Sequence, residues 1–115
     1  MITDSAGMTP FLLAASRGYL QLCGILMDHM TTEQIQAVDK HGRNALVLAI
    51  SNTHVHVAAY LITKGFSSQF KSPAPREWNL LFFAIATKNE PTVKFCLEQG
   101  ISPLETCGVS LGFIQ

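Results

Sequence analysis

The stretch TPFLLAASRG at residues 9–18 decides the fold of this chain of 115 residues. Pro10 suits the first position of a helix, because the N–H that proline lacks would have no helical partner there. Thr9 before it can cap the free N–H groups of the first turn. The apolar residues that follow predict a buried helix, and Gly18 predicts its end, since glycine readily takes the left-handed conformation found there.

The same pattern returns twice, each time after 35 residues and without a gap. Thr9 corresponds to Asn44 and then to Asn79, and both asparagines are also good N-caps. A fixed period of this length is typical of supersecondary units that stack on one another. The pattern predicts two helices in each unit, at residues 9–17 and 20–29, 44–52 and 54–64, and 79–87 and 90–99.

Residues 4–19, with the sequence DSAGMTPFLLAASRGY, resemble the ankyrin-repeat pattern, in which an Asp, a Gly, a Thr-Pro-Leu-His motif, two alanines and a Gly-His follow in this order. The resemblance covers residues 4–104 and is weakest at the start of the third unit. It implies an all-α ankyrin-repeat solenoid, in which helix-turn-helix units stack and loops protrude. The repeats lie at about 4–38, 39–73 and 74–108, and a partial or capping repeat lies at 109–115. Since the chain stops where the helix of a fourth unit would begin, we expect it to be part of a longer protein.

The usual ankyrin period is about 33 residues, so each unit here carries about two extra residues after its second helix. In the first unit they fall within 31–38, where Thr31 and Gln34 have the spacing of a capping box. This spacing predicts an added helical turn, with Ile35 and Val38 packed against the stack.

The histidine of the Thr-Pro-Leu-His motif is replaced in all three units, by Leu12, Val47 and Phe82. In the ankyrin family this imidazole joins neighbouring backbone segments through hydrogen bonds. Its loss indicates a stack that is held together more by apolar packing.

The formal net charge is zero, from 8 basic and 8 acidic residues. The chain therefore lacks the positive field that would attract nucleic acid or an anionic membrane. Charged residues make up 14% of the chain and hydrophobic residues 48%, and the charged share is well below the roughly 25% of typical soluble domains. Stacked units bury much apolar surface against each other. The rest of the high apolar content indicates that one or both ends of the stack are covered. Self-association through uncapped repeat ends would cover them.

Three cysteines, Cys23, Cys96 and Cys107, are too few and odd in number for a disulfide framework, which indicates a reducing compartment. Cys23 and Cys96 fall at core positions of second helices, where a free thiol behaves as a small hydrophobe. The N-terminus lacks the basic start and apolar run of a signal peptide, and no apolar run is long enough to span a bilayer. We therefore expect a cytoplasmic, intracellular protein or a secreted effector that is delivered into a host cell.

By resemblance to the family, partner recognition falls on a concave face. The loops before the first helices form its fingers, and the first helices form its palm. Met8, Arg43 and Trp78 occupy the same position in successive units and would form one column across the fingers, which Lys40 and Arg76 would make locally basic. Aromatic residues, Arg and Met are enriched in interface cores, so we expect a partner protein or peptide of acidic and aromatic character. The predicted partner-binding residues are Met8, Arg17, Lys40, His41, Arg43, Asn52, Arg76 and Trp78.

For Trp78 a structural role stays open, in which the ring packs against the irregular arm at 70–75. Pro73 and Pro75 exclude a helix there and favour an extended arm. For Arg43 we favour the role in recognition.

No catalytic, cofactor or metal site is predicted. His54 and His56 lack the complementary ligands of a zinc site, and His54 is explained by the Gly-His of the ankyrin pattern. No histidine has a visible nucleophile or acid beside it, and the sequence contains no Gly-rich phosphate loop.

The primary hypothesis is therefore a non-catalytic protein-protein interaction module that binds a partner protein or peptide on its concave face. The alternative is the substrate-targeting ankyrin segment of a larger enzyme or of a bacterial effector protein. We expect neither nucleic-acid binding nor membrane insertion.

Overall fold

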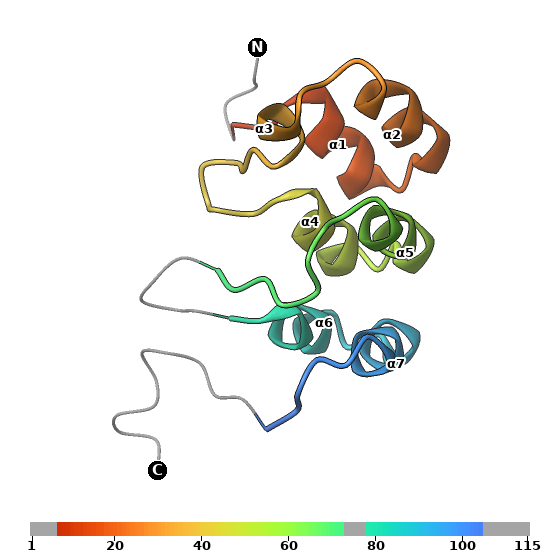
Figure 1. Cartoon of the computed structure of the whole chain (residues 1–115). Helices are drawn as coiled ribbons and strands as arrows, with labels where there is room; N and C mark the ends of the chain where they lie inside the picture. The colour runs from red at the N-terminus through yellow and green to blue at the C-terminus, as the bar shows by residue number, and fades with distance from the viewer. Residues whose placement is uncertain (1–6, 73–77, 105–115) are drawn as a thin grey trace.

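Three pairs of helices stack in one row in the computed structural model, which describes residues 7–72 and 78–104 (Figure 1). Each helix of a pair begins and ends within two residues of its predicted limits, so the predicted all-α stack of helix-turn-helix units is confirmed. The helices of the described residues are α1 (Pro10–Arg17), α2 (Leu20–Met27), α3 (Thr32–Ile35), α4 (Ala45–Ser51), α5 (Val55–Thr63), α6 (Leu80–Thr87) and α7 (Glu90–Glu98).

The first helix of each pair begins at a side-chain cap. The side-chain oxygens of Thr9, Asn44 and Asn79 accept hydrogen bonds from the N–H three residues later, at 3.2, 2.9 and 3.2 Å. These bonds satisfy N–H groups that have no partner within the helix. The three predicted N-caps are confirmed.

Each of these three helices is followed within two residues by a residue in the left-handed conformation. Gly18 has φ of 78°, and the residues at the equivalent positions, Thr53 and Lys88, have φ of 64° and 59°. This conformation costs a residue with a side chain more than it costs glycine. The turn between the paired helices therefore has the same left-handed residue in all three units, even where that residue is not glycine.

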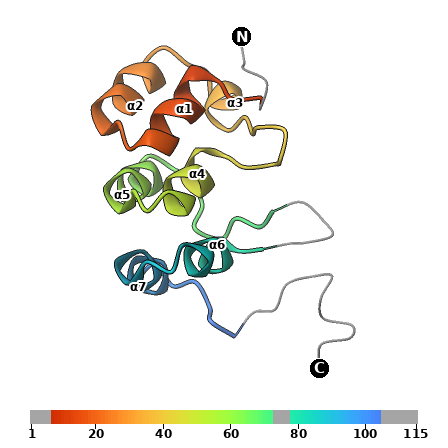
Figure 2. The same ribbon diagram turned by 180° about the vertical axis from the view of Figure 1, so that it is seen from behind.

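The core runs through the column of first helices, α1, α4 and α6, while α2, α5 and α7 form the second column (Figure 1 and Figure 2). Helix α4 is the most enclosed, because α1 and α6 contact it from the two neighbouring units and α5 contacts it from its own. All residues from Ala45 to Ile50 are buried. Leu12 and Val47, which replace the motif histidine, belong to this apolar core, and Phe82 at the third such position is half-buried.

The extra residues of the first unit form the predicted helical turn, α3. Its capping box is complete: Gln34 N–H donates to Thr31 Oγ1 at 3.2 Å, and Thr31 N–H donates to Gln34 Oε1 at 2.9 Å. Ile35 packs against the core, as predicted. The prediction for Val38 is wrong, since its side chain is exposed. Successive side chains of extended backbone point to opposite sides, and it is the next residue, Asp39, that points inward.

The predicted arm at 69–75 begins in a turn at Gln69, and Lys71 and Ser72 then pair with the start of the third unit. Lys71 and Asn79 form an antiparallel bridge, and Ser72 N–H donates to the carbonyl oxygen of Trp78 at 2.9 Å. Residues 73–77, Cys107 and the partial repeat at 109–115 lie outside the described residues. Over residues 7–72 and 78–104, no helix is long and apolar enough to cross a membrane.

Candidate protein-binding face

The loop before α4 forms a finger that is built on a buried carboxylate. Asp39 Oδ1 accepts hydrogen bonds from the N–H of His41 at 2.8 Å and from the N–H of Arg43 at 3.0 Å. Its Oδ2 accepts a hydrogen bond from Arg43 Nε at 2.8 Å and forms an ion pair with Arg43 Nη2 at the same distance. The Asp39 side chain thus fixes the backbone of the fingertip, which we define as Lys40 and His41, and of Arg43 after it.

The ionised form of Asp39 is favoured in the folded chain. Burial raises the pKa of this carboxyl group. Four effects lower the pKa by more than burial raises it: the backbone and side-chain hydrogen bonds from Arg43, the backbone hydrogen bond from His41 and the charge of Arg43. The net result is a pKa below the ordinary value of 3.8. The finger therefore keeps its internal ion pair at neutral pH.

Arg43 has a structural role that the sequence did not reveal. Its guanidinium is bound to Asp39, yet 35% of its side chain remains exposed. Lys40 and His41 at the tip are exposed. The finger thus presents two free basic side chains beside one whose charge is already balanced, and contact between Arg43 and a partner stays a prediction.

The first and second fingers touch through their backbones. Gly7 has φ of 78°, and a Cβ added there would lie 2.9 Å from the backbone nitrogen of Lys40. Only glycine allows so close an approach. Met8 beside it is partly buried against the core, so it contributes to packing as well as to the finger row.

Trp78 at the third finger is held by the helix that follows it. Its ring stacks on Phe82 at 6.0 Å between centroids and meets the ring of Phe83 edge-on at 5.3 Å. The backbone N–H of Trp78 donates to Ser72 Oγ at 2.9 Å. The half-buried ring therefore packs on α6, and the backbone of Trp78 is hydrogen-bonded to the arm. This arrangement favours the structural role over recognition, and a role in binding stays a prediction.

The palm residues lie at the ends of the first helices. Arg17 ends α1 and is exposed, and Asn52 follows α4 and is also exposed. The side-chain amide of Asn52 donates to the carbonyl oxygen of Leu48 at 2.8 Å, so part of its hydrogen-bonding capacity is used within the chain. The loop before α4 protrudes on one side of the stack (Figure 1). Arg76 lies outside the described residues.

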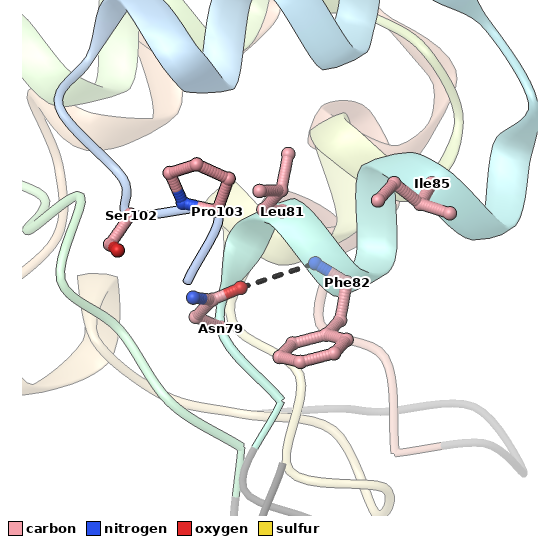
Figure 3. Close-up of a pocket in the computed structure, with 6 residues that line it drawn as sticks. All are labelled: Asn79, Leu81, Phe82, Ile85, Ser102 and Pro103. Atoms are coloured by element: carbon pink, nitrogen blue, oxygen red, sulfur yellow. Dashed lines mark hydrogen bonds between the residues drawn. The ribbon is translucent and has the colours of Figure 1, made fainter. Parts of the chain in front are cut away.

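An open pocket with a volume of about 50 Å³ lies at the last unit, a site that the sequence analysis missed (Figure 3). Phe82 and Ile85 reach it from α6, and Pro103 reaches it from the segment after α7. Asn79 Oδ1, at its edge, already accepts from Phe82 N–H. The lining residues, none of which is titratable, are Asn79, Leu81, Phe82, Ile85, Ser102 and Pro103. The pocket can take an apolar group but offers no acid or base.

Residues 1–72 match the family model described as ankyrin repeats (3 copies). This chain belongs to the ankyrin-repeat family. The ankyrin match ends before α6, so the third unit is assigned by its register with the first two and by its fold. Ankyrin repeats are typically non-catalytic, and they are protein-interaction modules, so this ankyrin chain is a protein-interaction module.

A chain in the solved structure of the Bd0816 predatory endopeptidase from Bdellovibrio bacteriovorus in complex with the immunity protein Bd3460 is similar to the ankyrin chain. The TM-score is 0.64 and the sequence identity 26%. The match covers 85% of the ankyrin chain and 49% of that chain, so the ankyrin chain spans about half its length. No curated protein matches significantly.

The histidines and cysteines considered as candidates for a metal site or a nucleophile lie in surroundings that suit a structural role. The rings of His54 and His56 lie 6.3 Å apart, and His54 abuts Gly18. Within residues 7–72 and 78–104, no cluster of three or more His, Cys, Asp or Glu side chains could hold a metal ion. Cys23 and Cys96 are buried free thiols, and burial raises the pKa of each to about 11, so neither is an activated nucleophile.

Proposed function

We propose that the ankyrin chain binds an acidic segment of a partner protein along its fingers and first helices. Within residues 7–72 and 78–104, the charged side chains are unevenly distributed. Among the described residues, the basic side chains on or next to the fingers and first helices are Arg17, Lys40, Arg43, Lys71 and Lys88, and the one acid there is the buried Asp39. The other described acids lie on or next to second helices or on α3, at Asp28, Glu33, Glu90 and Glu98.

The observation that carries this proposal is the exposed Lys40 on a fingertip whose backbone is fixed by Asp39. A partner carboxylate can approach Lys40 without meeting an exposed acid within the same finger, because Asp39 is buried and bound to Arg43. Complementary charge raises the association rate and selects the partner. A fixed loop also loses little conformational entropy on binding.

A peptide-display library selected against the full chain tests this proposal. We expect the selected peptides to be acidic and to contain aromatic residues. They should bind an Arg17→Glu/Lys40→Glu variant at least about tenfold more weakly. A Lys64→Glu variant is the matched control, since Lys64 is an exposed base at the end of α5 in the other column. Selected peptides without acidic bias, or equal losses in both variants, would refute the proposed face.

A folded enzyme is the second candidate partner. The similar solved structure joins an endopeptidase to its immunity protein, and a targeting role beside an enzyme would need the same exposed surface. We further propose that the ankyrin chain is not itself an enzyme and works in a reducing compartment. The apolar lining of the pocket and the buried free thiols support these two points. Measuring whether the chain inhibits or recruits a co-purifying enzyme separates this candidate from simple peptide binding.

A further inference from the structure

The first unit exposes apolar side chains on the side where a preceding unit would pack. We call this the upper face and define it by Leu13, Leu22 and Ile25. Leu13 is 40% exposed, whereas the residue at the same repeat position in the second unit, Leu48, is 2% exposed. Leu22 is 49% exposed, and its counterpart Val57 is fully buried. The same positions are therefore covered wherever a unit precedes them.

The third unit exposes the opposite kind of surface. We call it the lower face and define it by Phe82, Ile85 and Leu97, with the pocket of Figure 3 between α6 and Pro103. Ile85 is 57% exposed, whereas its counterpart in the second unit, Ile50, is fully buried. The position is covered wherever a unit follows it.

These two faces are the surfaces that meet inside the stack. Helix α1 packs its lower side on the upper side of α4, and α4 packs its lower side on the upper side of α6. Leu13 and Leu22 on the upper face and Ile85 on the lower face are apolar residues at positions whose counterparts in the second unit, Leu48, Val57 and Ile50, are buried. Solenoids normally end in units with a polar outer face, because an apolar end remains available for packing.

We propose that a second copy of this chain covers these faces, with the upper face of one copy packed on the lower face of the next. Leu13 of one copy would then enter the pocket beside Ile85 of the other. The contact repeats an interface that the chain already makes twice within itself. Since it joins two different surfaces, it does not close into a symmetric pair, and copies can add in a row.

Sedimentation velocity of the full chain over micromolar to submillimolar concentrations tests this proposal. We expect elongated oligomers whose mean size grows with concentration. Leu22→Glu on the upper face and Ile85→Glu on the lower face should each give a monomer, with association at least about a hundredfold weaker. Both side chains are about half exposed, so these variants should still fold. Val38→Glu is the control, because it adds the same charge to an exposed valine between the first two units.

Mixing the two monomeric variants gives the sharpest result. Leu22→Glu retains an intact lower face and Ile85→Glu retains an intact upper face, so the mixture should form a complex of one copy each and nothing larger. Dimers of either variant alone would indicate a symmetric contact and overturn the proposal. A wild-type chain that is monomeric throughout the concentration range would also overturn it. If Ile85→Glu then unfolded more easily than wild type, the lower face would be covered within the chain itself.

Discussion

Replacing Asp39 by alanine should destabilise the fold more than its place in a loop implies. The substitution removes three hydrogen bonds that the carboxylate accepts, two from backbone N–H groups and one from Arg43 Nε. At about 1 kcal/mol for each bond, the free energy of unfolding should fall by about 3 kcal/mol. Asp39→Asn keeps an oxygen for the two backbone bonds and loses the ion pair. Because Arg43 is 35% exposed, that pair is partly screened, and the loss should be about 1 kcal/mol.

The contribution of Asp39 should also depend on pH with a definite sign. Its pKa in the folded chain is lower than the ordinary value of 3.8, so the folded state binds the proton less readily than the unfolded state. The stabilisation is fully present above the unfolded pKa and is lost as the pH falls through the folded pKa. The difference in stability between wild type and Asp39→Asn should therefore shrink on acidification.

Urea unfolding followed by far-ultraviolet circular dichroism measures both effects, with Lys40→Ala as the control because Lys40 is exposed in the same finger. The reasoning fails if Asp39→Ala lies within about 0.5 kcal/mol of wild type, as an ordinary surface change would. It fails equally if the difference between wild type and Asp39→Asn stays constant below the ordinary Asp pKa.

Four further substitutions test the local geometry. Gly18→Ala should lower the free energy of unfolding by at least about 2 kcal/mol, because the new Cβ would lie 2.6 Å from His54 Nδ1 in a backbone with φ of 78°. Gly65 has φ of 110°, and a Cβ there would meet nothing within 4 Å. In the same urea titration, Gly65→Ala should lower the free energy of unfolding by only about 1 kcal/mol. Thr53→Gly should stabilise the chain by about 1 kcal/mol, since Thr53 has φ of 64°, and a lower melting temperature would contradict this. Trp78→Ala should cost about 2 kcal/mol through lost packing on α6; unchanged stability with lost partner binding would instead assign the ring to recognition.

The helices were predictable because their signals are local. Each N-cap oxygen binds an N–H only three residues away, and the capping box of Thr31 and Gln34 closes within one turn. Such short-range bonds depend on residue type and spacing, both of which the sequence states directly. Alternation in extended backbone could also have placed Val38 outward, once Asp39 was known to point inward.

The candidate face was less predictable, because its roles depend on which side chains meet in space. The spacing of Arg43 and Asp39 does not indicate an ion pair in a loop, since four residues bring side chains together reliably only in a helix. Trp78 looked equally suited to binding and to packing until the rings of α6 were placed beside it. The pocket at Ile85 depends on the conformation of the segment after α7, and no motif marks it.

The enclosure of α4 has a consequence for how the chain folds. The helix pairs with substantial contact all lie within one unit or in adjacent units, so no step needs to bring distant parts of the sequence together. Proteins rich in such near contacts fold quickly. Helix α4 contacts both neighbouring units, so the middle unit is the natural nucleus, and the amide hydrogens of α4 should exchange with solvent more slowly than those of α2 or α7, which can open first.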